Sequence, residues 1–342
     1  MEHKRSNLNP LFRQTRGKMN LLVTGCAGFI ASKVTELLLK RGDKVVGIDN
    51  LNGAYDVRLK EWRLRQLQEF ENFTFHRIDI TGPTQLEPLF EKSNFEAVIN
   101  LAARAGVRAS TEDPSPYLDT NIMGTLNLLE LCRKYKIRKF ILASTSSIYG
   151  EMSLPFTEDK KTDFPLSPYA ASKKGAEALC YTYHYLYGID ISIPRYFTVY
   201  GPAGRPDMSV FIFSKKIYAD EEIPVYGDGN QKRDFTYIGD IAEGTIKALR
   251  PLNYQIINLG GDHPVKLNYV ISLIENALGK KAKIKYLPRH PADVPATWAD
   301  IEKAKQLLSW KPEVNIEEGI KRTVQWLLEN WQWVKKVKPD VI

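Results

Sequence analysis

A tyrosine and a lysine stand four residues apart, at Tyr169 and Lys173, in the segment SPYAASK. Side chains with this spacing share one face of a helix, so the lysine ammonium group can lie beneath the tyrosine hydroxyl. A positive charge close to a tyrosine lowers its pKa and makes it a general base near neutral pH. The pair is therefore a candidate for removing the proton of a substrate hydroxyl group.

The spacing alone is a weak signal, because Tyr135 and Lys139 repeat it in RKYKIRKF, where a solvated helix end entering a strand is the favoured interpretation. The first pair differs in having the segment ASTSSIYG just upstream, a strand end with Thr145, Ser146 and Ser147. Ligands bind at the carboxyl ends of strands in open parallel sheets. The threonine hydroxyl can then hydrogen-bond the same substrate oxygen as the tyrosine, although these hydroxyls could instead cap a local turn.

A glycine-rich turn, GCAGFIA, connects the apolar run MNLLVTG to the helical pattern FIASKVTELLLKRG. Glycine is needed where the backbone turns tightly and approaches a pyrophosphate, whose charge is favoured at the start of a helix. Ala31 occupies the position of the usual third glycine and still permits close helix–sheet packing. This context predicts a dinucleotide site. The residues expected at the cofactor are Gly25, Ala27, Gly28, Phe29 and Ile30.

The second apolar run, KVVGID, ends at Asp49 and is followed by Asn50. An acid at this strand end hydrogen-bonds an adenosine ribose and repels a 2′-phosphate, which favours NAD over NADP. The alternative interpretation of this aspartate is a turn residue in IDNLN. By the same topology, residues after the third strand lie beside the adenine and residues after the fourth face the cofactor. They are Asp79 and Ile80, and Leu101, Ala102 and Ala103.

Short apolar runs alternate with helical patterns along the first half of the chain. The runs are MNLLVTG, KVVGID, FTFHRIDI, EAVINLAA and KFILASTS. Strands spaced by helices predict right-handed βαβ units and a parallel sheet covered on both faces. QIINLGG predicts one more strand of this sheet, and no linker separates the remaining segments. We therefore expect an α/β protein in which a second domain is interleaved with the first.

The composition is that of an ordinary globular protein, with 342 residues, 43% hydrophobic content and three cysteines, Cys26, Cys132 and Cys180. These cysteines form no CxxC pair, which argues against a disulfide scaffold and a structural zinc site, so no metal is expected. No stretch approaches 18 apolar residues, and the first residues lack the apolar run of a secretory signal. We expect a cytoplasmic protein without a membrane partner.

The net charge of +8 is concentrated at the two ends of the chain. Residues 1–18 carry five Lys/Arg and one Glu, residues 331–342 carry three Lys and one Asp, and the body between them has 40 basic and 38 acidic residues. A nucleic-acid-binding domain needs its basic residues clustered on the folded body. We expect no nucleic-acid partner, and interpret residues 1–18 and 335–342 as basic extensions.

The glycine turn, Asp49, the strand end at Thr145 and the Tyr169/Lys173 pair together resemble the extended short-chain dehydrogenase/reductase family. Within it they are similar to the NAD-dependent nucleotide-sugar epimerases and dehydratases, over residues 19 to about 333. The resemblance implies a tightly held NAD that is reduced and reoxidised within one turnover. It also implies that Thr145, Tyr169 and Lys173 are catalytic, the last two contacting NAD as well.

The same resemblance implies a Rossmann-type doubly wound parallel sheet with a smaller, discontinuous C-terminal substrate-binding domain. The NAD-binding domain would comprise residues 19–196 and about 234–261, and the second domain about 197–233 and 262–334. In this family, helices equivalent to TLNLLELCRKY and YAASKKGAEALCYTYHYLYG form a four-helix bundle between two subunits. A homodimer is therefore expected.

The triplet that begins at Thr145 indicates the reaction within the family. Thr-Asp-Glu at this place resembles the 4,6-dehydratases and Thr-Ser-Glu the UDP-glucuronate decarboxylases, whereas this chain has Thr145-Ser146-Ser147. Elimination and decarboxylation then lack their expected proton donor, which leaves epimerisation. The resemblance thus implies inversion of a UDP-sugar at carbon 4 through a transient 4-keto intermediate.

The segments YDVRLKEWRL, AGVRAS and RYFTVYGPAGRPDM resemble the UDP-glucuronate 4-epimerases, which produce UDP-galacturonate. Basic residues suit a carboxylated sugar, and Thr198 stands where the enzymes for neutral sugars usually have asparagine. Arg233 is similar to the family's diphosphate-binding arginine, and Asp293 to the acid at the uridine-side ribose. The implied substrate residues are Arg108, Thr145, Ser146, Ser147, Thr198, Arg205, Arg233 and Asp293.

Some alternatives stay open at this point. Three residues before Asp293, the neutral-sugar enzymes have arginine and this chain has His290, beside Arg289, so either side chain or neither could contact the diphosphate. Arg108 and Arg205 could serve in ordinary ion pairs. The whole protein could be a UDP-glucose/UDP-galactose 4-epimerase, or a catalytically idle NAD-binding protein on the same fold.

Overall fold

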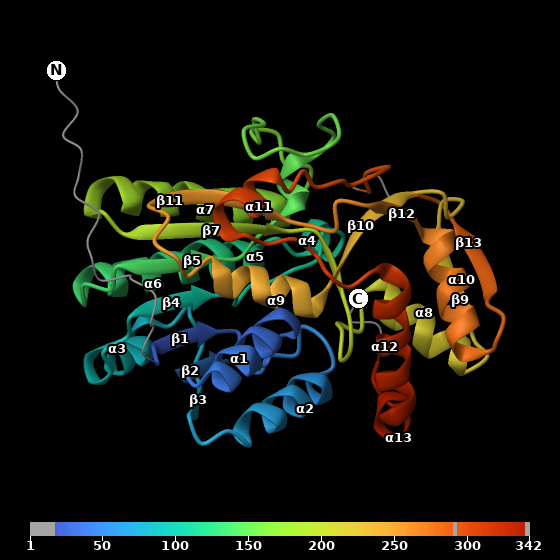
Figure 1. Cartoon of the computed structure of the whole chain (residues 1–342), viewed down its shortest axis with the longest axis horizontal. Helices are drawn as coiled ribbons and strands as arrows, with labels where there is room; N and C mark the ends of the chain where they lie inside the picture. The colour runs from blue at the N-terminus through green and yellow to red at the C-terminus, as the bar shows by residue number, and fades with distance from the viewer. Residues whose placement is uncertain (1–17, 290–292, 339–342) are drawn as a thin grey trace.

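A parallel β-sheet of eight strands runs through the centre of the molecule, within the residues that the computed structural model describes, 18–289 and 293–338 (Figure 1). The strand order is β11-β7-β5-β4-β1-β2-β3, and β6 pairs with β7. The strands are β1 (Asn20–Thr24), β2 (Lys44–Asp49), β3 (Phe73–Arg77), β4 (Ala97–Asn100), β5 (Lys139–Leu142), β6 (Ser144–Thr145), β7 (Asp190–Tyr196) and β11 (Tyr254–Leu259). The order reverses at β1, which pairs with both β2 and β4, so the predicted doubly wound sheet is confirmed.

Helices cover both faces of the sheet, which is why its central strands are apolar runs. One face is covered by α1 (Phe29–Arg41), α9 (Ile238–Lys247) and α11 (Glu302–Leu308). The other face is covered by α3 (Pro83–Lys92), α6 (Gly124–Lys134) and α7 (Pro168–Tyr187). Leu21, Leu22 and Val23 of β1 are completely buried because both cores meet on this strand.

Shorter elements connect the strand ends to these helices. α2 (Val57–Gln68) lies beside α1 and the edge strand β3. The segment before α6 contains α4 (Ala109–Glu112), α5 (Ser115–Leu118) and the π-helix η2 (Asp119–Met123). The 3₁₀-helix η3 (Ser146–Tyr149) follows β6 directly.

A smaller part of the molecule packs beside the carboxyl ends of the central strands (right-hand side of Figure 1). Its first sheet contains β8 (Thr198–Tyr200), β10 (Lys232–Tyr237) and β12 (Pro264–Lys266), and its second contains β9 (Glu222–Tyr226) and β13 (Lys283–Leu287). Its helices are α8 (Ser209–Tyr218), α10 (Leu267–Leu278), α12 (Ile316–Glu329) and α13 (Trp331–Val334). The chain returns to the large sheet for α9 and β11 between visits, so this part is discontinuous, as expected from the sequence.

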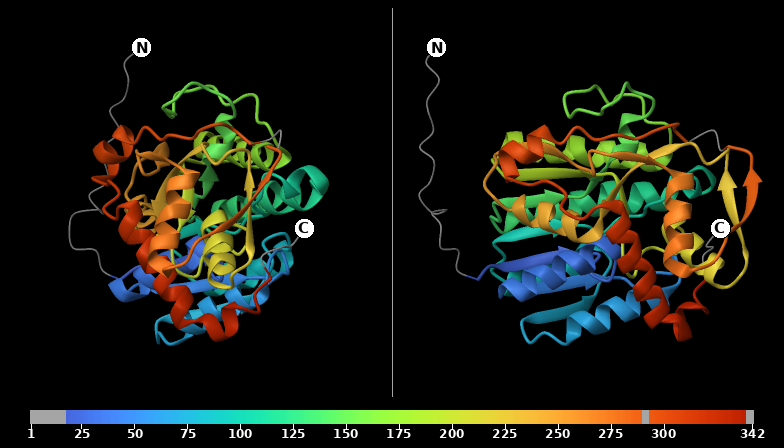
Figure 2. Two further views of the ribbon diagram at one scale, coloured as in Figure 1. Left: turned by 90° about the vertical axis from the view of Figure 1, so that its right-hand side faces the viewer. Right: turned by 45° about the vertical axis from the view of Figure 1, so that its right-hand side comes forward.

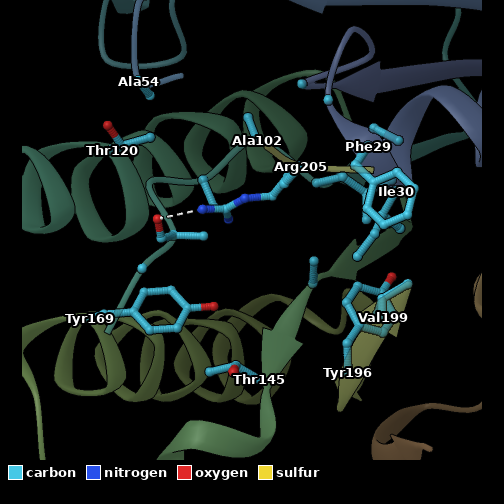
Figure 3. Close-up of a pocket in the computed structure, with 18 of the residues that line it drawn as sticks. Phe29, Ile30, Ala54, Ala102, Thr120, Thr145, Tyr169, Tyr196, Val199 and Arg205 are labelled. Carbon is cyan, nitrogen blue, oxygen red and sulfur yellow. Dashed lines mark hydrogen bonds between the residues drawn. The ribbon is translucent and has the colours of Figure 1, made fainter. Parts of the chain in front are cut away.

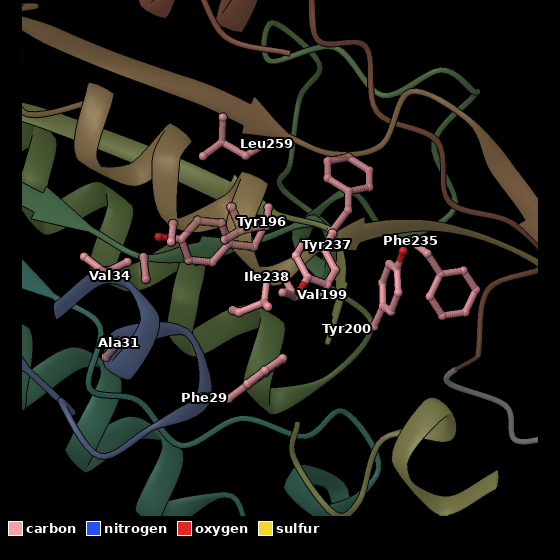
Figure 4. Close-up of a cluster of buried hydrophobic side chains, with 14 of the residues drawn as sticks. Phe29, Ala31, Val34, Tyr196, Val199, Tyr200, Phe235, Tyr237, Ile238 and Leu259 are labelled. Carbon is pink, nitrogen blue, oxygen red and sulfur yellow. The ribbon is translucent and has the colours of Figure 1, made fainter. Parts of the chain in front are cut away.

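A hydrophobic cluster spans the two parts (Figure 4). Phe29 at the start of α1, Tyr196 of β7, Val199 of β8 and Ile238 of α9 all belong to it and are at least nine-tenths buried. Packed interiors resist small displacements, because each side chain fills the space between its neighbours. The carboxyl ends of the central strands are therefore held firmly against the smaller part.

The second tyrosine–lysine pair lies outside the strand carboxyl ends. Tyr135 caps the end of α6, and Lys139 begins β5. The interpretation of this pair as a solvated helix end is wrong for the lysine, which is buried and contacts the carboxylate of Asp190 at 2.5 Å and the hydroxyl of Ser192 at 2.8 Å. Burial requires such partners, which a solvated side chain would not need.

Candidate active site

The carboxyl ends of the central strands open into a cavity of about 380 Å³, here called the central cavity (Figure 3). Most of the residues predicted to bind a cofactor line it: Gly25, Gly28, Phe29, Ile30, Asp49, Asn50, Asp79, Ile80, Leu101, Ala102 and Ala103. The predicted residues Thr145, Ser146, Ser147, Tyr169, Lys173, Thr198 and Arg205 line it too. Ala27 is fully buried, and Arg108, Arg233 and Asp293 lie elsewhere.

At two positions, the turn between β1 and α1 has room for glycine only. Gly25 has a φ of +67°, and a Cβ atom there would lie 2.8 Å from the Cα atom of Ala102. A Cβ atom on Gly28 would lie 2.8 Å from the carbonyl oxygen of Gly25. Gly28 also starts α1 without any side-chain cap, so the first N–H groups of the helix stay available to an anion. These features fit the diphosphate of a dinucleotide.

Asp49 at the end of β2 is buried and fixes the same turn. Its Oδ2 accepts a hydrogen bond from the N–H group of Ala27 at 3.2 Å, and its Oδ1 accepts one from the N–H group of Leu51 at 2.8 Å. Lys60 of α2 lies 4.0 Å from Oδ1 and donates to the backbone and side-chain oxygens of Asn52, both at 2.9 Å. Lys60 and Asn52 both line the central cavity. Sequence reasoning missed both, although Lys60 lies in the segment YDVRLKEWRL that resembles the UDP-glucuronate 4-epimerases.

The tyrosine, lysine and threonine of the predicted catalytic set come from two elements. Ser167 caps the start of α7 by accepting from the N–H group of Ala170, which places Tyr169 in the first turn (Figure 3). Burial raises the pKa of Tyr169, and its hydrogen bond with Thr145 and the positive charge of Arg205 oppose this rise. The threonine hydroxyl also accepts from the N–H group of Ser147 at 3.2 Å, so it caps η3 and faces the tyrosine at once.

Lys173 lies one turn further along α7 and is buried. Its ammonium group donates to the carbonyl oxygen of Ala143 at 2.9 Å, just before β6. Burial lowers the pKa of Lys173 to about 8, while the carboxylate of Glu177 acts in the opposite direction. The cation that lowers the pKa of Tyr169 in this structure is Arg205; the same effect from Lys173 stays a prediction.

Arg205 reaches across the central cavity from the side of Phe29 towards the side of Tyr169 (Figure 3). It donates to the carbonyl oxygen of Ala105 at 3.1 Å and pairs with Asp207 at 3.0 and 2.5 Å. An arginine in this place offers planar donors to a carboxylate or a phosphate inside the cavity.

The other predicted substrate residues form a separate group, here called the outer arginine cluster, made of Arg108, Arg233, Arg289 and Asp293. Arg108 donates to the carboxylate of Asp293 at 2.5 Å and lies 3.8 Å from the centre of the Tyr226 ring. Arg289 donates to the main-chain oxygen of Asp293 at 3.1 Å. Burial lowers the pKa of Arg233; Asp293 opposes this and the other two arginines add to it. The cluster holds three arginines and one aspartate, and its excess of positive charge attracts an anion. His290 lies outside the described residues.

Comparison with known proteins agrees with this geometry. The family model described as GDP-mannose 4,6 dehydratase matches residues 22–323. The chain belongs to this family. It is 61% identical over 318 residues to a "UDP-glucuronate 4-epimerase" of Thermodesulfobacterium geofontis, covering 93% of this chain and 98% of the relative.

Two solved structures of UDP-sugar epimerases share the fold of this family member. One is a UDP-glucuronic acid 4-epimerase from Bacillus cereus in complex with UDP-glucuronic acid and NAD, with a TM-score of 0.87 and 41% identity, covering 91% of this chain and all of the other. The second is a UDP-glucose 4-epimerase from Thermotoga maritima with UDP-glucose, with a TM-score of 0.84 and 33% identity, covering 92% and all of the respective chains.

In this family member, a buried ion pair lies behind the predicted catalytic residues, and sequence reasoning missed it. Glu177 accepts two hydrogen bonds from Arg195, at 2.9 and 2.8 Å, and one from the hydroxyl of Ser144 at 2.6 Å. Glu177 continues the four-residue spacing that begins with Tyr169 and Lys173, and this was the signal that could have found it.

The described residues contain neither a candidate metal site nor a membrane-spanning helix. Residues 18–289 and 293–338 hold no group of three or more His, Cys, Asp or Glu side chains that could bind a metal ion. Within the same ranges, no helix combines the length and the apolar character needed to cross a membrane.

Proposed function

We propose that this chain is an NAD-dependent isomerase that inverts carbon 4 of UDP-glucuronate to give UDP-galacturonate. The observation that carries the proposal is the central cavity, where Tyr169 faces Thr145 and Arg205 and where the triplet after β5 holds hydroxyls in place of a carboxyl group. The close relative named UDP-glucuronate 4-epimerase supports the choice of sugar.

NAD is held, in this proposal, by the glycine turn and the strand ends beside it. The uncapped start of α1 receives the diphosphate, Asp49 receives the adenosine ribose, and Asp79 and Ile80 lie at the adenine. Leu101, Ala102 and Ala103 face the remainder of the cofactor. When bound, NAD would supply the hydride acceptor, and in its reduced form the hydride donor, for carbon 4 of the sugar.

Tyr169 takes the proton from the sugar 4-hydroxyl and gives the same proton back when the hydroxyl is restored. Thr145 positions that oxygen through its hydroxyl, which already contacts the tyrosine. The positive charge of Arg205 favours the ionised tyrosine. In this proposal Lys173 adds to that effect, and burial of the site strengthens both interactions because the dielectric constant is low.

In this proposal, four hydroxyl groups of the central cavity protect the sugar from losing carbon dioxide. A 4-keto uronic acid is a β-keto acid, and it decarboxylates when the bond from carbon 5 to the carboxylate overlaps with the carbonyl π system. Ser146, Ser147 and Thr198, together with Thr145, hold the carboxylate near the ring plane, where this overlap is poor. None of these four side chains is an acid that could protonate the resulting carbanion.

The outer arginine cluster holds the nucleotide diphosphate in this proposal. Arg108 and Arg233 bind the phosphates as planar donors, and Asp293 binds the uridine-side ribose. Arg108 then exchanges its present partner, the carboxylate of Asp293, for a phosphate oxygen. Rotation of the sugar about its bond to the fixed diphosphate presents either face to the same catalytic residues.

The homodimer and the cytoplasmic location are part of the proposal as well. Tyr181, Tyr185 and Leu186 of α7 are exposed to 53, 76 and 58%, and Met123 before α6 to 48%, which supports an apolar contact with a second subunit. All three cysteines are free and buried, which suits a reducing compartment. Light scattering of the purified chain at micromolar concentration tests the dimer.

The decisive experiment is a product analysis. The NAD-loaded protein is incubated separately with UDP-glucuronate and UDP-glucose, and the sugars are resolved by ion-exchange chromatography. The proposal expects UDP-galacturonate from the first substrate and little UDP-galactose from the second. Preferential conversion of UDP-glucose would indicate the neutral-sugar epimerase, and no conversion of either would indicate an idle NAD-binding protein.

A further inference from the structure

Arg63 of α2 is a buried arginine that lies behind the central cavity, outside its lining. Only 2% of its surface is exposed, and within residues 18–289 and 293–338 it forms no ion pair with a carboxylate. Burying a guanidinium group without a counter-charge costs free energy unless its donors are all satisfied. Its hydrogen-bond partners therefore indicate what this arginine does.

Those partners belong to three different segments. Arg63 donates to the carbonyl oxygen of Ala203 at 3.0 and 2.6 Å and to that of Gly204 at 3.1 Å. It also donates to the carbonyl oxygen of Ala27 at 3.1 Å and to the hydroxyl of Tyr55 at 2.7 Å. The two ends of this network are thus the glycine turn and the loop of residues 201–208.

The glycine turn is fixed from both sides of one residue. The N–H group of Ala27 donates to Asp49, and its carbonyl oxygen accepts from Arg63. Fixing both groups of this residue sets the direction in which the turn presents its remaining N–H groups.

The loop of residues 201–208 needs an outside partner for a physical reason. Ala203 has a φ of +52°, a backbone region that non-glycine residues adopt only at a cost, and it receives two of the arginine's hydrogen bonds. Gly204 lies beside the ring of Phe29, the first residue of α1. The next residue is Arg205, whose side chain crosses the central cavity (Figure 3).

We propose that Arg63 is a positioning residue that ties the loop carrying Arg205 to the turn that receives the cofactor diphosphate. One buried side chain thereby fixes both the glycine turn at the cofactor site and the position of Arg205, which faces the substrate. The part concerning Arg205 rests on the proposed function, whereas the link between turn and loop does not.

The neighbouring Trp62 provides a matched control on the same helix. Its ring packs on Trp326 of α12, with centroids 5.5 Å apart, and on Trp333 of α13 at 6.1 Å. In Figure 2, α12 passes beside α2, in agreement with these contacts. Trp62→Leu removes packing from α2 but removes no donor or acceptor of the hydrogen bonds that Arg63 makes.

The first experiment measures amide hydrogen exchange of the peptide covering 201–208, with and without NAD, in the wild type, Arg63→Met, Arg63→Lys and Trp62→Leu. In the wild type, NAD should slow exchange of this peptide. In Arg63→Met the basal exchange should rise roughly tenfold, because buried carbonyl groups lose their donors, and the effect of NAD should vanish. Arg63→Lys should be intermediate, and it carries the test if Arg63→Met does not fold. Trp62→Leu should behave as the wild type in this peptide.

The second experiment measures NAD dissociation and the ratio of kcat/KM for UDP-glucuronate to that for UDP-glucose. Arg63→Met should speed NAD release and lower the ratio, each by roughly tenfold, and adding Arg205→Met should lower the ratio little further. NAD-dependent protection of 201–208 that is as strong in Arg63→Met and Arg63→Lys as in the wild type, or that is lost equally in Trp62→Leu, would overturn the proposal. A wild type that converts neither sugar would refute the proposed function alone, because exchange and NAD release would still test Arg63.

Discussion

The central cavity and the outer arginine cluster both gather polar side chains beside the large sheet, but they are held in different ways. In the cavity, Thr145 and Lys173 are at least nine-tenths buried; the threonine hydroxyl accepts from the N–H group of Ser147 in η3, and the lysine donates to the carbonyl oxygen of Ala143. In the outer cluster, Arg108 and Asp293 keep 32 and 21% of their side-chain surface exposed and contact each other. Fixed, dry groups suit catalysis, whereas exposed groups that can exchange partners suit binding.

The largest expected effect concerns the fixed region. Tyr169→Phe removes only the hydroxyl that is proposed to move the substrate proton, so kcat should fall roughly a thousandfold while NAD stays bound. Turnover and the absorbance of the retained cofactor check this result. A variant with near wild-type turnover would show that Tyr169 is not the base.

A substitution in the outer arginine cluster should change KM and leave kcat nearly unchanged. Arg233→Met removes a planar donor from the diphosphate, so KM for the UDP-sugar should rise roughly 10- to 100-fold, with kcat changed little and NAD affinity unchanged. Steady-state kinetics and calorimetric titration with UDP check this. A fall in kcat at unchanged KM would contradict the division between the two regions.

Burial of Lys173 in the central cavity should lower the stability of the folded protein, and this cost can be measured. Burial lowers the pKa of Lys173 to about 8. Between pH 8 and the higher pKa that this lysine has in the unfolded chain, the unfolded chain therefore binds more protons than the folded one. The contribution of Lys173 to the stability of the wild type should therefore rise with pH across this range. Lys173→Met should raise the free energy of unfolding at pH 7 by roughly 2 kcal/mol, remove this contribution to the pH dependence and abolish most activity. Denaturation at pH 7 and 10 measures both; equal pH dependence in the two proteins would disprove this contribution of Lys173.

The smallest expected effect is a change of product. Ser147→Ala or Thr198→Ala loosens the carboxylate, so the ratio of UDP-pentose to UDP-galacturonate should rise roughly tenfold with turnover largely kept. Chromatography of the products measures this ratio, and Ser209→Ala, outside the cavity lining, serves as the control. Variants as free of pentose as the wild type would rule out the carboxylate clamp.

The sequence predicted the fixed region better than the outer cluster, for a physical reason. Strand ends in a doubly wound sheet converge at one edge, so Gly25, Asp49 and Thr145 could be placed together from alternation of strands and helices alone. The partners of Arg108 and Arg233 come from loops whose course depends on distant contacts. Arg63 was missed because a helical arginine in a polar segment looks like a surface residue until the loop of residues 201–208 is seen to cover it.

NMR of UDP-glucuronate incubated with the NAD-loaded wild type in deuterium oxide tests the proposed epimerisation at carbon 4. Because the hydride leaves carbon 4 and returns to it without exchange with water, we expect UDP-galacturonate with hydrogen retained at carbon 4 and at carbon 5. Deuterium at either carbon, release of a UDP-pentose as the main product, or an unchanged substrate would contradict this epimerisation.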